Sequence, residues 1–247
     1  MNILNLIRER IAAMLGLVVV TICFAAMGAF LAFYVSPQQA LEWRRINALP
    51  EFTPALLDSA APGADVVFTG TLTDNPALVN DLVAYQTSVW EVSPPDNSND
   101  SPDGSWQITE TVIPALQVSF QGAVITTVPA NSARLGGQWR ESIEEGSGSL
   151  SDSYNNRELP DGSIRTVGFA NGDLVTVFGQ KASTGGVIPA HLFGGDRIQL
   201  VDSVRQGART AFLAGISFMA CSPLMLLIGG FAILRGRARG GINIRLG

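Results

Sequence analysis

The sequence predicts a membrane protein in which two transmembrane helices flank an extracytoplasmic all-β domain, either a barrel or a sandwich. The first observation behind this prediction is the run Ala211–Leu234, which holds 24 residues without one charge. A helix of that length is about 36 Å long, enough to cross the hydrocarbon core of a bilayer. Arg235, Arg237 and Arg239 follow at once, and we expect them to anchor this end at the cytoplasmic surface.

The second observation is another uncharged run of 25 residues, Ile11–Val35. It is longer than the apolar core of a signal peptide, which has about 7–15 residues. It also ends near Tyr34, an amphipathic ring of the kind that lies at a membrane interface. We therefore expect an uncleaved first span, preceded by a short cytoplasmic segment, 1–10.

The charge of the chain is uneven, and this predicts its topology. Residues 36–210 carry ten basic and twenty acidic side chains, a net charge of −10, whereas the two ends together carry +5. We expect both termini, including the basic tail 235–247, in the cytoplasm and the central domain outside. The dominance of Arg over Lys suggests a bacterial inner membrane. An acidic domain with the single lysine Lys181 offers no basic face, which argues against a nucleic-acid partner.

The segment after the first span, 36–62, reads as a juxtamembrane helix and a linker. Ser36 and Pro37 fit the N-cap and first position of a helix. This helix carries Trp43, Arg44 and Arg45, which suit either an interfacial anchor or a stalk. The linker is rich in Pro, Ala and Ser, and a second connector, 203–210, precedes the second span.

Short segments rich in β-branched and aromatic residues fill the region 63–202 and predict the β domain. The expected strands are Val66–Leu72, Leu82–Val92, Trp106–Val112, Ala115–Phe120, Ala123–Val128, Ile164–Phe169, Leu174–Gln180 and Arg197–Val201. Ser93–Ser105 reads as a polar hairpin loop. Arg134–Pro160 is rich in Gly and Ser, so we expect a mobile excursion there.

Small residues at helical spacing mark possible contact faces on both spans, because close helix packing in lipid depends on them. The candidates are Ala25, Gly28, Ala29 and Ala32 in the first span, and Gly215, Ala220, Gly229 and Gly230 in the second. One such face could serve the two helices and another an outside partner. Pro223 should kink the second span.

Few residues in the sequence suggest catalysis or metal binding. His191 is the only histidine, so a histidine cluster is excluded, and the two cysteines, Cys23 and Cys221, fall inside the spans. The loop with Asp96, Ser98, Asp100 and Asp103 is similar to a calcium loop, but the required Gly and Glu are replaced by Ser101 and Gln107. We expect no catalytic residue, no metal and no cofactor.

The order of these elements is similar to that of the GIDE family, also called the BAM or "beside a membrane" domain. Gly70–Glu91 resembles the family's opening pair of strands, with Val83 and Tyr85 as its Val-x-Tyr. Trp106 followed by Pro114–Leu135 resembles its middle hairpin, and Gly172–Gln180 a later strand.

The resemblance implies a β-rich domain outside the membrane with a binding or scaffolding role. Ubiquitin-ligase members carry a cysteine-rich RING domain after the second span. The thirteen residues after Leu234 contain no cysteine, and Leu82 stands where the family has a cysteine. The ligase activity therefore does not carry over.

These observations lead to the expectation of a non-enzymatic scaffold or accessory subunit of a larger membrane complex. Its partners would be membrane lipid and other integral membrane proteins. Two alternatives stay open: an envelope domain that binds a small molecule or lipid, and an envelope enzyme that uses His191 with loop carboxylates.

Overall fold

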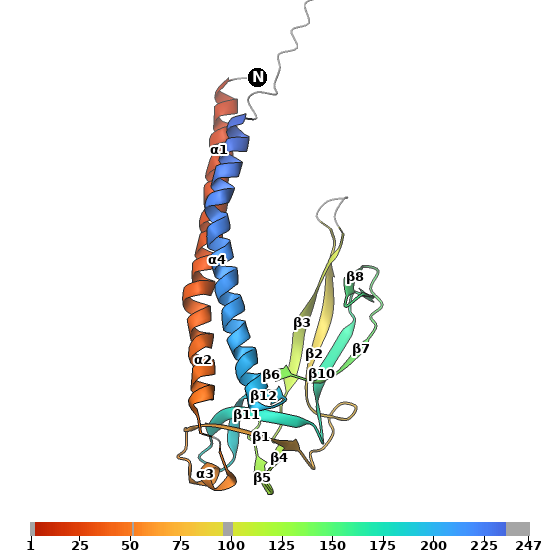
Figure 1. The fold of residues 1–247 in the computed structure, drawn as a ribbon. Coiled ribbons are helices and arrows are strands. Elements are labelled where there is room, and N and C mark those ends of the chain that lie inside the picture. The colour runs from red at the N-terminus through yellow and green to blue at the C-terminus, as the bar shows by residue number, and fades with distance from the viewer. Residues whose placement is uncertain (1–2, 51, 96–100, 236–247) are drawn as a thin grey trace, which may run out of the picture. The chain divides into compact units, whose positions relative to one another are not determined.

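The computed structural model describes residues 3–50, 52–95 and 101–235 (Figure 1). The expected anchors Arg237 and Arg239 lie outside the described residues, as do Asp96, Ser98 and Asp100 of the acidic loop. The chain divides into two compact units, one of residues 1–44 with 204–247 and one of residues 45–203. Each unit is described by itself.

The N-terminal helix continues through the position where the sequence predicts a break. It comprises α1 (Ile3–Phe30), a π-helical turn η1 (Leu31–Val35) and α2 (Ser36–Ala48). Ser36 has helical dihedral angles, and its N–H donates to the carbonyl oxygen of Leu31. The expected helix start at Ser36 is therefore wrong. Pro37 lacks an N–H and its ring crowds the preceding turn, and the wider π turn accommodates it without ending the helix.

The second long helix, α4 (Arg197–Arg235), begins earlier than expected. The predicted strand Arg197–Val201 is wrong because these residues are helical, and the connector 203–210 continues the same helix. The reason is a capping box, in which Asp196 Oδ1 accepts from the N–H of Gln199 at 2.8 Å and Gln199 Oε1 accepts from the N–H of Asp196 at 3.1 Å. Residues 11–48 and 197–233 are long and apolar enough to cross a membrane by length and composition.

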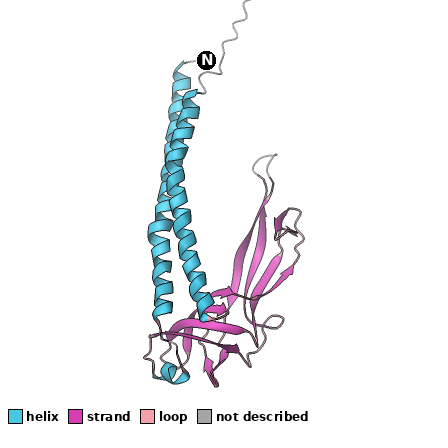
Figure 2. Cartoon of the chain, in the orientation of Figure 1, coloured by secondary structure: helices cyan, strands magenta, loops and turns pink. Residues whose placement is uncertain are grey.

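The other unit is built mainly of strands (Figure 2). A short helix, α3 (Pro54–Ser59), lies in the predicted linker and starts at the N-cap Thr53. Among the described residues twelve strands follow: β1 (Asp65–Leu72), β2 (Leu82–Ser93), β3 (Asp103–Val112), β4 (Gln117–Phe120), β5 (Ala123–Thr126), β6 (Arg134–Gly137), β7 (Arg140–Glu144), β8 (Ser151–Tyr154), β9 (Arg157–Pro160), β10 (Ile164–Ala170), β11 (Leu174–Lys181) and β12 (Val187–Gly194).

Six strands form the larger sheet, in the order β5-β4-β1-β11-β12-β6. All neighbours are antiparallel except β12 and β6. A bridge between Thr127 and Val187 joins the end of β5 to the start of β12, so five of these strands form an almost closed ring. The ring has an apolar core in which Phe68 and Phe120 pack with ring centroids 5.5 Å apart.

A second sheet has the order β3-β2-β10-β7, and β8 and β9 form a separate hairpin. β6 of the larger sheet, β7 of the second sheet and the hairpin β8–β9 all lie in the stretch Arg134–Pro160, where the sequence predicts a mobile excursion and no strand. At the tip of the hairpin, Asn155 and Asn156 have φ angles of 51° and 62°. Asparagine tolerates this left-handed region, which a two-residue hairpin turn requires.

The structure therefore has two long apolar helices flanking a β-sheet domain, as the sequence predicts at this coarse level.

Candidate functional site

The two long helices pack antiparallel along a seam of small residues. A Cβ added to Gly28 would lie 2.6 Å from the carbonyl oxygen of Gly215, and one added to Gly215 would lie 2.6 Å from the backbone nitrogen of Ala32. Both distances are far below van der Waals contact, so glycine is required at both positions. The structure thus brings Gly28, Ala32 and Gly215 together, but they join this chain's own helices and are not open to an outside partner.

The seam extends in both directions, and apart from Gly215 and Gly229 the residues that continue it were not predicted from the sequence. On α4, Ala208, Gly215 and Ser222 are buried at intervals of seven, and Gly229 follows at the same interval against the side chain of Leu17. A repeat of seven keeps one side of a helix against its neighbour. On the facing helix the buried small residues include Thr21 and Ser36.

The hydroxyl groups of Thr21 and Ser222 in the seam have partners inside their own helices. Thr21 donates to the carbonyl oxygen of Leu17 at 2.8 Å, and Ser222 donates to that of Phe218 at 2.9 Å. A buried polar group without a hydrogen-bond partner is costly in an apolar environment. These two bonds therefore allow the seam to lie in such an environment.

The remaining small candidates do not contribute to the closest contact. Ala25 and Ala29 are half-buried, Ala220 is exposed, and a Cβ on Gly230 would meet nothing within 4 Å. The outward faces instead carry large apolar side chains, with Leu227 and Ile228 each 70% exposed and Phe33 69% exposed. Tyr34 is exposed as well and stacks on Phe30 with centroids 5.1 Å apart.

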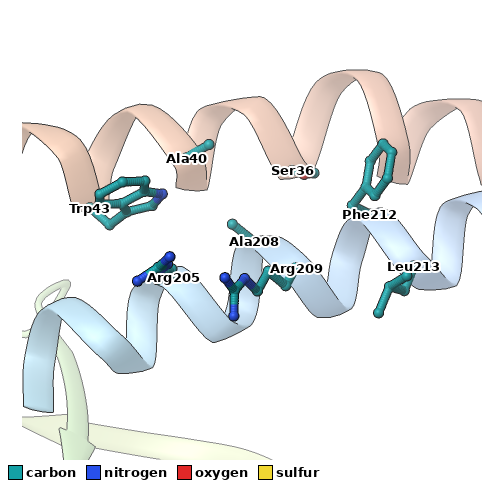
Figure 3. A pocket seen from close by; sticks show the side chains of 8 residues that line it. All are labelled: Ser36, Ala40, Trp43, Arg205, Ala208, Arg209, Phe212 and Leu213. Carbon is teal, nitrogen blue, oxygen red and sulfur yellow. The ribbon is translucent and has the colours of Figure 1, made fainter.

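A groove of about 510 Å³ lies between α2 and α4 (Figure 3). Its lining combines two aromatic side chains, two cations, a hydroxyl and aliphatic side chains: Ser36, Ala40, Trp43, Arg205, Ala208, Arg209, Phe212 and Leu213. Trp43 and Arg205 point toward one another across the groove, with the guanidinium carbon 5.6 Å from the ring centroid. Arg44 lies over the same ring at 5.5 Å.

The arginines that the sequence predicts as interfacial anchors differ in their surroundings. Arg45 makes an ion pair with Asp65 at the start of β1, so its charge is already matched. Arg205 and Arg209, which were not predicted, are in no ion pair with a carboxylate within the described part of the chain. The groove is therefore the place where unmatched positive charge meets apolar surface.

Arg197 caps the C-terminal end of α2. Its Nη2 donates to the carbonyl oxygens of Ile46 at 2.9 Å, Asn47 at 3.0 Å and Leu49 at 2.7 Å. The last carbonyls of a helix have no partner inside the helix, and a cation there also interacts favourably with the helix dipole. One side chain thus ties the end of α2 to the start of α4.

His191 lies on β12, where it is 8% exposed and packs against Phe178 with centroids 5.9 Å apart. It lines neither the groove nor the pocket of about 420 Å³ formed by 126–129 and 184–186. Within the described residues, no group of three or more His, Cys, Asp or Glu side chains could hold a metal ion.

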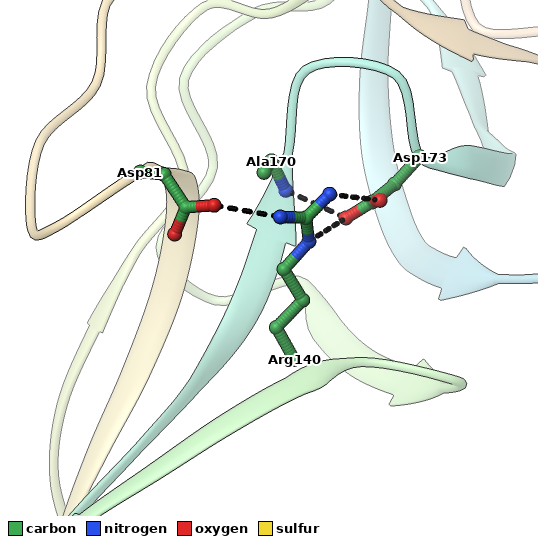
Figure 4. Close-up of polar contacts among 4 residues, drawn as sticks. All are labelled: Asp81, Arg140, Ala170 and Asp173. Carbon is green, nitrogen blue, oxygen red and sulfur yellow. Dashed lines mark hydrogen bonds and ion pairs between the residues drawn. The ribbon is translucent and has the colours of Figure 1, made fainter.

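Arg140, the first residue of β7, connects the loop before β2 to the turn between β10 and β11 (Figure 4). It donates to Asp81 at 2.6 Å and to Asp173 at 2.9 Å, while Asp173 also accepts from the N–H of Ala170 at 2.7 Å. The hydrogen bond to Asp173 and its charge raise the pKa of Arg140 further above its ordinary value. The group stays charged and acts as a brace, not as an acid or base.

An aromatic cluster joins the β8–β9 hairpin to the second sheet. The rings of Trp90, Trp106 and Tyr154 lie with centroids 4.9 to 5.7 Å apart, and Arg165 lies over Trp106 and Tyr154. Arg165 is also 2.5 Å from a carboxylate oxygen of Glu141. The guanidinium of Arg165 already covers the faces of these rings, so they are not available to a ligand. The cluster therefore serves as a structural core.

Tyr85, the tyrosine of the Val-x-Tyr named above, donates a hydrogen bond from its hydroxyl to the carboxylate of Glu110 on β3 at 3.4 Å. Desolvation raises the pKa of its phenol, and the nearby carboxylate raises it further. The group is therefore a neutral hydrogen-bond donor at ordinary pH.

Comparisons of this chain with protein-family models, with curated proteins and with solved structures found no match.

Proposed function

We propose that this chain is a non-enzymatic membrane scaffold or accessory subunit, anchored by its two helices in a bacterial inner membrane. The observation that carries the proposal is the distribution of side chains on the helix pair. Small residues and satisfied hydroxyls face the seam, and large apolar side chains face outward along both helices. Apolar surface of that extent suits lipid tails or neighbouring transmembrane helices.

The β domain offers a surface on which a partner protein could bind. β3 is ten residues long and pairs with β2 alone among the described strands. The N–H of Gly104 at its start donates to Asp152 of β8, and beyond this point the other edge of β3 has no strand partner among the described residues. An open edge presents unpaired backbone groups, and a partner strand can extend the sheet there. Ile108 on this strand is 64% exposed, which adds apolar contact area.

The test is to solubilise native membranes in a mild detergent and identify the proteins that co-purify with the full-length chain. We expect at least one integral membrane protein in a stable complex. Ile108→Lys should release a partner that binds at β3, because a charge on an edge strand opposes strand addition. Ile188→Lys is the matched control, since Ile188 is also exposed but lies on β12, which has neighbours on both sides.

A wild-type chain that runs alone as a monomer in several mild detergents and in nanodiscs would contradict the scaffold proposal. Loss of the partner in Ile188→Lys but not in Ile108→Lys would contradict the choice of β3 as the binding edge.

A further inference from the structure

We propose that the groove between α2 and α4 binds the phosphate headgroup of an anionic phospholipid. This inference rests on the proposed insertion of the helix pair in a membrane. It adds a specific lipid class and the residues that would recognise it.

The first argument is the position of the groove along the helices. Ser36 directly follows the uncharged run Ile11–Val35, and Arg209 lies two residues before the uncharged run that begins at Ala211. The lining residues of α4, from Arg205 to Leu213, span about 12 Å along the helix axis. The headgroup region of one leaflet is about 5–8 Å thick, so the groove would reach from the headgroups to the first acyl carbons.

The second argument is the donor chemistry at the polar end. Arg205 and Arg209 are four residues apart on one helix, so they project from the same face. A guanidinium presents a planar fork of donors that matches two phosphate oxygens, and it is weakly hydrated compared with an ammonium. Neither arginine has a carboxylate partner within the described residues, so a bound anion would meet no competing carboxylate there.

The third argument is the apolar end, which distinguishes a lipid from a soluble anion. Phe212 and Leu213 are 44% and 64% exposed, and Ala40 and Ala208 complete this wall. A free phosphate would leave this surface uncovered, whereas an acyl chain would bury it. Trp43 closes the polar end with its ring against Arg205 (Figure 3), and an indole between polar and apolar layers is typical of a membrane interface.

The same features disfavour a zwitterionic headgroup. A choline or ethanolamine group would bring a cation next to two arginines, and the described lining contains no carboxylate to receive it. A headgroup with net negative charge, such as phosphatidylglycerol, avoids this repulsion. The expected occupant is therefore one anionic phospholipid.

The experiment measures lipid retention by native mass spectrometry of the full-length, delipidated protein. Phosphatidylglycerol, phosphatidylcholine or inorganic phosphate is added in separate titrations. The variant Arg205→Gln/Arg209→Gln is compared with Arg157→Gln/Lys181→Gln, which removes the same charge from the β domain. Each arginine near an anionic surface contributes roughly fivefold, so we expect the groove variant to bind phosphatidylglycerol roughly 30-fold more weakly. The control variant should match the wild type, with one tightly retained lipid.

Three results would overturn the proposal: equal retention of phosphatidylglycerol by the groove variant and the wild type, equal retention of phosphatidylcholine by the wild type, or release of the lipid by millimolar phosphate. Alkaline carbonate extraction of native membranes that contain the protein distinguishes failure of the lipid site from failure of the proposed function. A chain that resists extraction but shows no lipid preference refutes only the lipid site. A chain that carbonate removes from the membrane refutes both proposals.

Discussion

At the scale of single residues, the helix pair depends on backbone meeting backbone at Gly28 and Gly215. Two helices with ordinary side chains stay 8–10 Å apart, and glycine at the crossing allows a closer approach. Around this point the aromatic rings of Phe24 and Phe218 pack across the seam with centroids 5.6 Å apart. Dispersion contacts of this kind are the main attraction available to helices in lipid.

Replacing Gly28 or Gly215 by leucine should therefore separate the helices. The added side chain would have to displace backbone atoms, and overpacking of this kind costs about 1–3 kcal/mol or more. We expect lower thermal stability of the full-length protein in detergent and loss of a disulfide engineered between cysteines at Phe24 and Phe218. Gly16→Leu and Gly230→Leu are the matched controls, because a Cβ at either position meets nothing within 4 Å. Equal effects of all four substitutions would contradict the seam.

The spacing of small residues was enough to predict Gly28, Ala32, Gly215 and Gly229 but not which neighbour each of them contacts. A pattern in one helix shows a face that allows close approach, whereas the identity of the neighbour depends on the tertiary structure. Thr21, Ser36 and Ser222 were missed because hydroxyl residues were not counted as small. Arg205 and Arg209 were missed because their groove exists only when residues about 165 positions apart pair.

At the scale of elements, the ends of the helices are fixed by side chains whose partners are distant in sequence. Asp196 and Gln199 cap the N-terminus of α4. Arg197, which lies between them in sequence, caps the C-terminal end of α2. The segment Arg197–Val201 alternates polar and apolar residues and so reads as a strand. The capping box at its start was the signal for a helix, and it takes precedence because it satisfies the first free N–H groups.

Arg197→Gln should loosen the end of α2. The variant leaves the carbonyl oxygens of Ile46, Asn47 and Leu49 without their charged donor, and losing a partly buried hydrogen bond to a charged group costs about 1–3 kcal/mol. We expect a lower free energy of unfolding and faster proteolysis after residues 45–50. Arg157→Gln is the control, since Arg157 forms an exposed pair with Glu145 and such pairs contribute about 0–1 kcal/mol. Equal stability of the two variants would rule out the capping role.

The strands were easier to predict where apolar residues alternate than where turns determine the structure. β1, β2, β10 and β11 follow runs of β-branched and aromatic residues, and the sequence predicts them to within about two residues. The hairpin β8–β9 contains few apolar residues, and its best signal is the pair Asn155-Asn156 at the turn. β12 was missed because Pro189 and His191 interrupt its pattern, although Pro189 lies beside a bulge in the pairing with β11.

At the scale of the whole molecule, both proposals depend on the two helices crossing a membrane together. Arginines also flank the spans at the ends that lead into the β domain. By the positive-inside rule, these arginines would argue against placing the β domain outside the membrane. Arg45 is paired with Asp65 and Arg197 caps α2, so structural roles account for two of them. The lipid site would account for Arg205 and Arg209. On this basis we retain the prediction that both termini are cytoplasmic and the β domain is outside.

The most direct test of this topology is cysteine labelling with an impermeant thiol reagent in intact spheroplasts. Cys23 and Cys221 are first replaced by alanine, and single cysteines are placed at Ser183, in an exposed turn of the β domain, or at Gly247. We predict that Ser183→Cys reacts in intact spheroplasts, whereas Gly247→Cys reacts only after the membrane is permeabilised. Labelling of Gly247→Cys with Ser183→Cys protected, or equal labelling of both in intact spheroplasts, would contradict the account.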